Sequence, residues 1–470
     1  MDQGISRLSR LPVISRISAS MRPVHLARRF QETVALAALL LLGLSVRIWM
    51  APKVSFLPDI VQFKYWGEEM ARAPLSEFYR TAYPPSEILP GYLYVLAAIE
   101  HLRAWIAGPV SMLDDYVFWA KLVPIAADIG LGIIAFWLCR PFLGPVRSLI
   151  AAGLVLFNPG VAVASTVWAQ ADSLGMGLSM LAFGALVRGS PVAAGALGAL
   201  AFVTKPQYTL FLAVGGVAYL GREFRHLSSL RGAKTKVAWF KWAFSQFLLP
   251  ACSLVAALQL LLMPFSVSIW PGPHVQWTLR GLLMVATGKY PVTSFTAFNL
   301  WGTPIAGMEL PDATRGFLSL SYQTWGLLLF LAVIAVSLFF TWTHTDDFPA
   351  LLWASFVVSF GFFELTTRMH GRYLFPALPL LAVGSVFRRW MIPYYVALSA
   401  LYLVDTWYSW ELWVSGGKDM TFAGILDLAT AASVFSVLLF LSSFMVTIVS
   451  MRRRNTSAAY SNSLRHTHGS

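Results

Sequence analysis

Four basic residues lie in short turns between apolar runs, at positions where a membrane protein rarely carries charge without a function. Arg368, His370 and Arg372 share one short polar turn, and Lys205 directly precedes a proline between two apolar runs. Guanidinium and ammonium groups bind phosphate, and the planar guanidinium does so through paired hydrogen bonds. The alternatives are membrane anchoring for the long side chains and plain packing for His370. We predict that these four residues bind a phosphate.

Two further pairs of residues suit a sugar ligand. Gln170 and Asp172 lie at the start of a predicted helix, where helix capping is the alternative role. Asn299 supplies an amide for hydroxyl groups, and Trp301 an indole face for a pyranose ring. Tryptophan is also common at membrane–water interfaces, so Trp301 has that second interpretation. We predict that Gln170, Asp172, Asn299 and Trp301 bind the sugar or the acceptor.

The composition places these residues in a membrane protein. Of 470 residues, 57% are hydrophobic and only 12% are charged, against about 45–50% and about 25% in soluble domains. This excludes a soluble enzyme and a disordered chain. The net charge of +13 comes from short basic blocks between apolar runs, which is the pattern of membrane orientation, so we expect no nucleic-acid partner. Two cysteines in apolar stretches, Cys139 and Cys252, exclude a disulfide framework.

The apolar runs predict an all-α polytopic membrane protein with about twelve transmembrane helices. Each spanning helix needs about 20 apolar residues. The predicted spans are 33–51, 117–139, 148–165, 171–187, two within 189–221, 243–263, 321–342, 349–365, 373–387, 391–407 and 425–450. The pair within 189–221 should meet at a turn at Lys205-Pro206, because proline ends a helix. Residues 88–107 are predicted to lie against the outer leaflet; a crossing helix is the alternative.

The basic blocks give the orientation and the domains. Twelve spans place all of them on the cytoplasmic side. Residues 1–32 then form a basic cytoplasmic tail, 33–450 a single membrane domain, and 451–470 a cytoplasmic C-terminal tail in a multi-pass protein of the cell membrane. The loops 52–116 and 264–320 face outward together with the turn that carries Arg368 and Arg372. Polar groups from many helix ends would therefore converge on the outer face, where a membrane enzyme would build its site.

Five motifs in order resemble the GT-C superfamily of integral-membrane glycosyltransferases. The branch that they resemble most contains the bacterial relatives of the mannosyltransferase that adds the second mannose of GPI anchors. The motifs are Pro58-Asp59 with Tyr83-Pro84-Pro85, Asn158-Pro159 with Trp168 to Ser173, Thr204 to Gln207, Asn299-Leu300-Trp301, and Thr367 to Pro376. In this branch Gly is usual where Ala169 stands, and Glu where Gly371 stands.

The resemblance implies a GT-C-like fold, with juxtamembrane helices in the first outer loop, and an inverting sugar transfer. The donor would be a polyprenyl-phosphate hexose, such as mannose, and the acceptor a lipid-linked or cell-envelope glycan. Asp59 matches the catalytic Asp of the superfamily and would be the base, with helix capping as its other possible role. No D-x-D pattern follows Asp59, so we expect no cofactor and no metal, although Glu68 and Glu69 keep a divalent ion possible.

Two other functions compete with a transferase. A transporter or a flippase for lipid-linked sugars should carry ionisable residues deep in the membrane, and Asp128 is the clearest such residue. Most other charges gather at helix ends, and the two halves of the chain do not mirror each other, which favours the enzyme. A degenerate assembly subunit is the third hypothesis, and the Gly371 departure is its only sequence hint.

Overall fold

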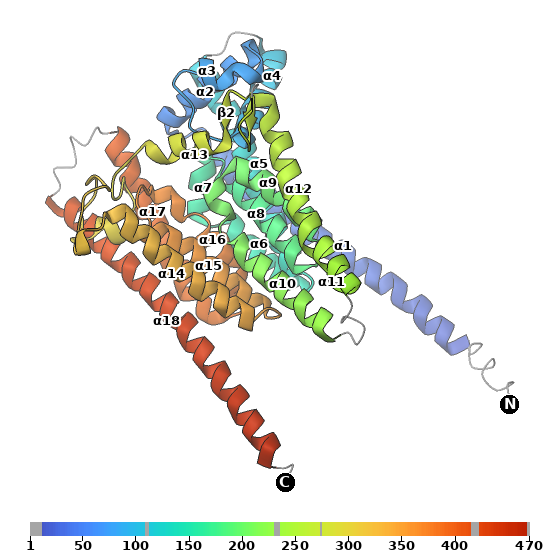
Figure 1. Cartoon of the computed structure of the whole chain (residues 1–470). Helices are drawn as coiled ribbons and strands as arrows, with labels where there is room; N and C mark the ends of the chain where they lie inside the picture. Colours follow the sequence, from blue (N-terminus) through green and yellow to red (C-terminus); the bar gives the residue numbers. More distant parts are fainter. Residues whose placement is uncertain (1–11, 109–111, 230–235, 273–274, 415–422, 468–470) are drawn as a thin grey trace, which may run out of the picture.

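The computed structural model is an all-α protein (Figure 1). It describes residues 12–108, 112–229, 236–272, 275–414 and 423–467, so the ends of both predicted tails, 1–11 and 468–470, lie outside it. Long helices run side by side as a bundle, and α2, α3 and α4 form a lobe at one end (Figure 1). Among the described residues the only strands are two short parallel ones, β1 and β2.

The first half of the chain supplies the lobe and one side of the bundle. Its elements are α1 (Pro12–Met50), α2 (Leu57–Arg72), η2 (Leu75–Glu77), α3 (Phe78–Thr81), α4 (Pro90–Ala107), α5 (Leu113–Cys139), α6 (Pro145–Leu156), α7 (Pro159–Thr166), α8 (Asp172–Val187), α9 (Pro191–Thr204), η3 (Pro206–Thr209) and α10 (Leu212–Ser229). Helix α1 begins at Pro12 and therefore runs through most of the predicted N-terminal tail.

The second half completes the bundle. Its elements are α11 (Lys236–Ala243), the π-helical turn η4 (Phe244–Leu248), α12 (Leu249–Leu262), η5 (Met263–Phe265), β1 (Val267–Ser268), β2 (Trp277–Thr278), α13 (Leu279–Gly288), η6 (Leu300–Gly302), η7 (Phe317–Ser319), α14 (Tyr322–Thr343), α15 (Phe348–Leu365), η8 (Gly371–Leu374), α16 (Ala377–Ser385), η9 (Arg389–Met391), α17 (Ile392–Val414) and α18 (Ala423–Thr467). Helix α18 continues into the predicted C-terminal tail.

Six helices of the described chain are long and apolar enough to cross a membrane. They are Arg29–Met50, Leu113–Cys139, Trp239–Phe265, Tyr322–Thr343, Phe348–Leu365 and Leu428–Met451. The predicted count of about twelve is not confirmed. Helices α8 and α9 are apolar but have only 16 and 14 residues, and α16 has nine, whereas a span needs about 20.

One predicted span contains a bend, and one predicted break is confirmed. Residues 148–165 form two helices, α6 and α7, that are bent by 48°. The side chain of Asn158 accepts hydrogen bonds from the backbone N–H groups of Gly160 and Val161, which starts a new helix at Pro159. At Lys205-Pro206 the chain turns as predicted, because α9 ends at Thr204 and Lys205 is extended.

Helix α4 covers the ambiguous residues 88–107. It is not among the candidate spans of the described chain and lies with α2 and α3 in the lobe (Figure 1). Glu100 and Arg103 interrupt its apolar sequence, and their side chains form a buried ion pair with each other. At Gly91 a Cβ would lie only 2.6 Å from the backbone of Thr204, so glycine allows α4 to pack directly on the end of α9. Its position at the outer leaflet stays a prediction.

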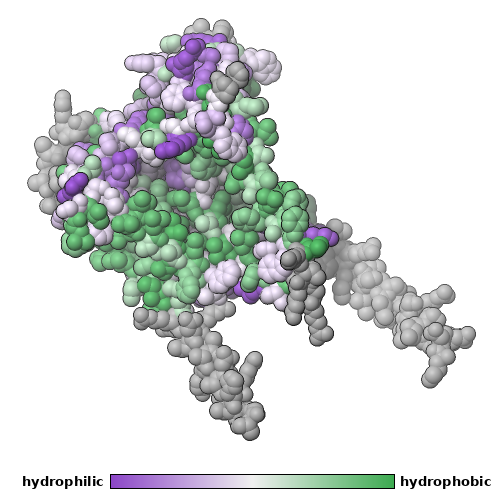
Figure 2. All heavy atoms as spheres, in the orientation of Figure 1, coloured by the Kyte–Doolittle hydropathy of each residue, from purple (hydrophilic) through white to green (hydrophobic). Residues whose placement is uncertain are grey.

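The surface divides along the bundle axis. Figure 2 shows an apolar band across the bundle and hydrophilic residues on the lobe. Helix α5 starts against the lobe, where Tyr116 donates to the carbonyl of Phe63, and its 27 residues span about 40 Å. The exposed cations Arg140, Arg225 and Arg388 follow α5, belong to the last two turns of α10 and follow α16, respectively. The predicted orientation, with the basic blocks on the cytoplasmic side, stays a prediction.

Candidate active site

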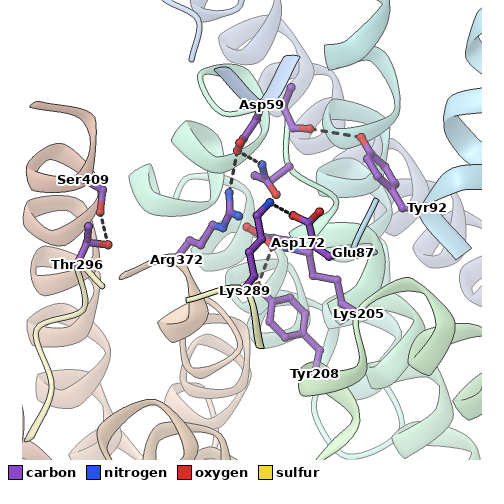
Figure 3. Close-up of polar contacts among 12 residues, drawn as sticks. Asp59, Glu87, Tyr92, Asp172, Lys205, Tyr208, Lys289, Thr296, Arg372 and Ser409 are labelled. Atoms are coloured by element: carbon purple, nitrogen blue, oxygen red, sulfur yellow. Dashed lines mark hydrogen bonds and ion pairs between the residues drawn. The ribbon is translucent and has the colours of Figure 1, made fainter. Parts of the chain in front are cut away.

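A cavity of about 380 Å³ lies where the lobe meets the bundle. Its walls come from the start of α2, the 168–171 segment, the turn after α9, the end of α13, η8 and α17. The sequence predicted nine site residues, and five of them line this cavity: Asp59, Gln170, Lys205, His370 and Arg372. Segments more than 300 residues apart in the chain thus contribute to one chamber (Figure 3).

Asp59 sits in the first turn of α2 and points to the cavity. Its Oδ2 accepts hydrogen bonds from Gln170 Nε2 at 2.5 Å and from Arg372 Nη1 at 2.8 Å (Figure 3). Its Oδ1 accepts none from any described residue. Helix α2 has no side-chain cap bond, so the structure does not support the capping alternative. Asp59 is therefore oriented by two partners and keeps one oxygen for a ligand.

Arg372 links Asp59 to the rest of the cavity. The short helix η8 presents it from the turn after α15, and its side chain is about a quarter exposed, at 27%. Burial opposes its charge, but Asp59 and Asp172 outweigh burial and raise the pKa of Arg372. Its Nε is buried without a hydrogen-bond partner. The guanidinium can therefore hold Asp59 and an anion at the same time.

Lys205 lines the cavity at the turn after α9. Pro206 ends α9 at this point, and the ammonium group of Lys205 pairs with Asp172 at the start of α8 (Figure 3). Asp172 is fully buried and does not line the cavity; it also accepts a hydrogen bond of 2.8 Å from the hydroxyl of Tyr208. Helix α8 has no side-chain cap bond either. Asp172 thus positions Lys205, whereas contact with a sugar was predicted.

His370 lines the cavity among aromatic rings. The ring packs on Tyr290 and Phe295, with centroid distances of 5.0 and 4.8 Å. Burial, and then the charges of Arg372, Lys289 and Lys205, lower the pKa of His370 well below its ordinary value. The same region therefore favours negative charge in a ligand and disfavours a proton on His370.

Lys289 is a cavity residue that the sequence did not single out. It directly follows α13 and pairs with Glu87 of the lobe, so that this ion pair joins the two long loops that the sequence predicts to face outward (Figure 3). In the sequence, Lys289 directly precedes Tyr290-Pro291, and no other feature marks it. The cavity-lining aromatic residues Tyr92, Trp168 and Trp413 were also missed as site residues. Trp168 stacks on Phe56 and keeps a buried Nε1 without a partner.

Besides Asp172, three predicted site residues lie outside the cavity lining. Arg368 has a positive φ of 66°, and its Nε donates to Asp312 at 2.6 Å. Asn299 is fully buried, and its Nδ2 donates to the carbonyl of Phe363. Trp301 is 3% exposed and donates from Nε1 to the carbonyl of Leu365. Protein groups already satisfy these side chains, so the geometry gives them a structural role.

The fold and the site define an all-α protein with spanning-length helices and a charged cavity at one end of the bundle. Among the residues described, no group of three or more His, Cys, Asp or Glu side chains is arranged to hold a metal ion. Scanned against models of known protein families, the chain matches none, and no curated protein is significantly similar to it. Any function must therefore be argued from the motifs and from the cavity.

Proposed function

We propose that the chain is a membrane glycosyltransferase that moves a hexose from a polyprenyl-phosphate sugar to a hydroxyl group of an extracytoplasmic acceptor. The sequence motifs suggest mannose as the hexose and a lipid-linked or cell-envelope glycan as the acceptor. One observation carries the proposal. A carboxylate with one open oxygen, Asp59, is paired through Arg372 to a cavity edged by three cations.

The charges of the cavity suit the leaving phosphate. Arg372, Lys205 and Lys289 all act on the same point, since each lowers the pKa of His370. The departing phosphate gains negative charge as the bond to the sugar breaks, and fixed cations stabilise that change. Each of the three cations is also held by a carboxylate, Asp59, Asp172 or Glu87, which fixes its position for an anion. We assign Lys289 to the phosphate site in place of Arg368, because Lys289 lines the cavity and Arg368 does not.

Asp59 suits the role of the base. The acceptor oxygen would attack the anomeric carbon, the bond from that carbon to the phosphate oxygen would break, and the hydroxyl proton would pass to Asp59 Oδ1. The carbon–oxygen bond forms on the face opposite the leaving group, so the anomeric configuration inverts. Gln170 holds Oδ2 from the other side and fixes the carboxylate plane.

The size and place of the cavity fit these substrates. Its volume of about 380 Å³ falls in the usual range for small-ligand pockets, about 300–1,000 Å³. It lies at the lobe end of the bundle, away from Arg140, Arg225 and Arg388. A lipid-linked donor could thus keep its chain in the apolar band while its sugar enters the cavity (Figure 2).

The test is direct sugar transfer by the purified protein in lipid nanodiscs. Polyprenyl-phosphate mannose with a radiolabelled sugar is added to a membrane-lipid extract, and glucose and arabinose donors are run in parallel. We expect one donor to label the extract, with inversion at the anomeric carbon and release of polyprenyl phosphate. EDTA tests the expected metal independence. The proposal fails if no donor is consumed, and movement of a labelled donor across vesicles would then favour the flippase.

A further inference from the structure

A buried ion pair connects α1 to α5, and neither of its residues is part of the cavity lining. Arg47 of α1 donates from Nε to Asp128 Oδ2 of α5 at 2.6 Å, and both side chains are 0% exposed. Arg47 also donates from Nη1 to the carbonyl of Gly43. Asp128 was the residue that most favoured a transporter, because an intramembrane carboxylate often marks an ion path. Here it already has a counter-ion.

Asp128 also binds the two serines that flank a site segment. Ser165, near the end of α7, donates to Oδ2 at 2.6 Å. Ser173, the second residue of α8, donates to Oδ1. Residues 166–172 lie between these serines and include Gln170, which contacts Asp59. One carboxylate therefore fixes both ends of the stretch that orients the proposed base.

The segment between the serines needs such support. Ala169 has a left-handed backbone with φ 53°, which is unfavourable for a residue with a Cβ. Its neighbour Gln170 is held by a backbone hydrogen bond of 3.0 Å to the carbonyl of Ala164. A residue in a sparsely populated conformation persists only where its surroundings enforce it.

We propose that Asp128 is a positioning residue for the site, acting through Ser165 and Ser173 on Gln170 and thereby on Asp59. Arg47 supplies the charge that lets this carboxylate stay buried. Only the kinetic test of this inference rests on the proposed function. Misplacing a catalytic group by about 1 Å costs roughly 10²-fold in rate, so loss of the two serine bonds should lower kcat by about that factor and change KM little.

Two double variants separate positioning from stability. Arg47→Met/Asp128→Leu replaces the ion pair with apolar groups, which usually preserves stability, but leaves Ser173 without its acceptor and Ser165 with only the carbonyl of Ala162, at 3.1 Å. Arg47→Gln/Asp128→Asn keeps an oxygen that accepts from a serine. We expect the apolar pair to lose about 10²-fold in kcat and the amide pair less than 10-fold, with similar melting temperatures. Equal kcat losses in the two variants would contradict the inference.

A matched control is the other buried ion pair, Glu100–Arg103, which does not line the cavity. Glu100→Leu/Arg103→Met should keep kcat within about 3-fold; a loss as large as that of the Asp128 variant would mean that any buried pair matters equally.

Hydrogen–deuterium exchange gives a readout that needs no enzymatic activity. The apolar variant at Arg47 and Asp128 should speed exchange in 166–175 at least 10-fold and leave α15 unchanged. Unchanged exchange in 166–175 overturns the inference, even if the wild-type protein proves to transfer no sugar and the proposed function fails on its own.

Discussion

Substitutions of Arg368 and Arg372, which share one turn, should have different effects on sugar transfer, although the sequence analysis assigned both residues to the phosphate. Arg372 lines the cavity, with one N–H on Asp59 and a buried Nε that has no partner. Arg368 is held by Asp312 and the carbonyl of Thr287. Only Arg372 should therefore affect sugar transfer, and equivalent substitutions at the two positions provide a matched comparison.

The size of the effect follows from the hydrogen bonds that are lost. Each hydrogen bond to a charged group contributes about 1.5–3 kcal/mol. Arg372→Lys keeps the charge but loses about one such bond to the phosphate, so kcat/KM should fall about 10- to 150-fold. Arg372→Met loses about two, or about 3–6 kcal/mol, and should fall about 10²- to 10⁴-fold. Arg368→Lys keeps its pairing with Asp312 and should stay within about 3-fold.

The assay is steady-state transfer from the radiolabelled donor by purified variants, with thermal unfolding as the check on folding. The reasoning is refuted if Arg368→Lys loses as much kcat/KM as Arg372→Lys, or if Arg372→Met keeps the wild-type value while folded.

Three further predictions concern single positions. Ala169→Gly relieves the left-handed backbone and should change the free energy of unfolding by less than about 1 kcal/mol while keeping transfer. Gly371→Ala would place a Cβ on the carboxyl group of Asp405, so it should cost about 1–3 kcal/mol in unfolding experiments. Burial and nearby cations lower the pKa of His370, so the unfolded chain binds a proton that the folded chain does not. Lowering the pH from 7 to 5.5 should therefore destabilise the wild type by up to about 1.4 kcal/mol more than His370→Phe, measured by thermal unfolding.

The sequence analysis assigned residues from distant parts of the chain to one site, and the structure brings several of them together, whereas the number of spanning helices was not confirmed. Gln170, Lys205 and Arg372 were selected by residue type and position and Asp59 by the family resemblance, and all four line one cavity. Charged groups at the ends of apolar runs are few, so each one is informative. The count of spans was not confirmed because hydropathy does not show how short helices such as α8 are placed.

The predicted site residues that lie outside the cavity have a common feature. Arg368, Asn299 and Trp301 have side chains that suit a ligand, but protein groups far away in the sequence satisfy them. Lys289 became a site residue only because Glu87 and the end of α13 bring it to the cavity. A linear sequence gives the type of a side chain, whereas its partner depends on packing between loops that are distant in the chain.

The most direct test of the central claim compares wild-type protein with Asp59→Asn in the same transfer assay. The variant keeps an oxygen for Gln170 and nearly the same shape, but it cannot accept the proton of the acceptor. We expect donor binding to remain and kcat to fall at least 10²-fold, the lower end of what a general base contributes. Transfer by Asp59→Asn at the wild-type rate would contradict the account.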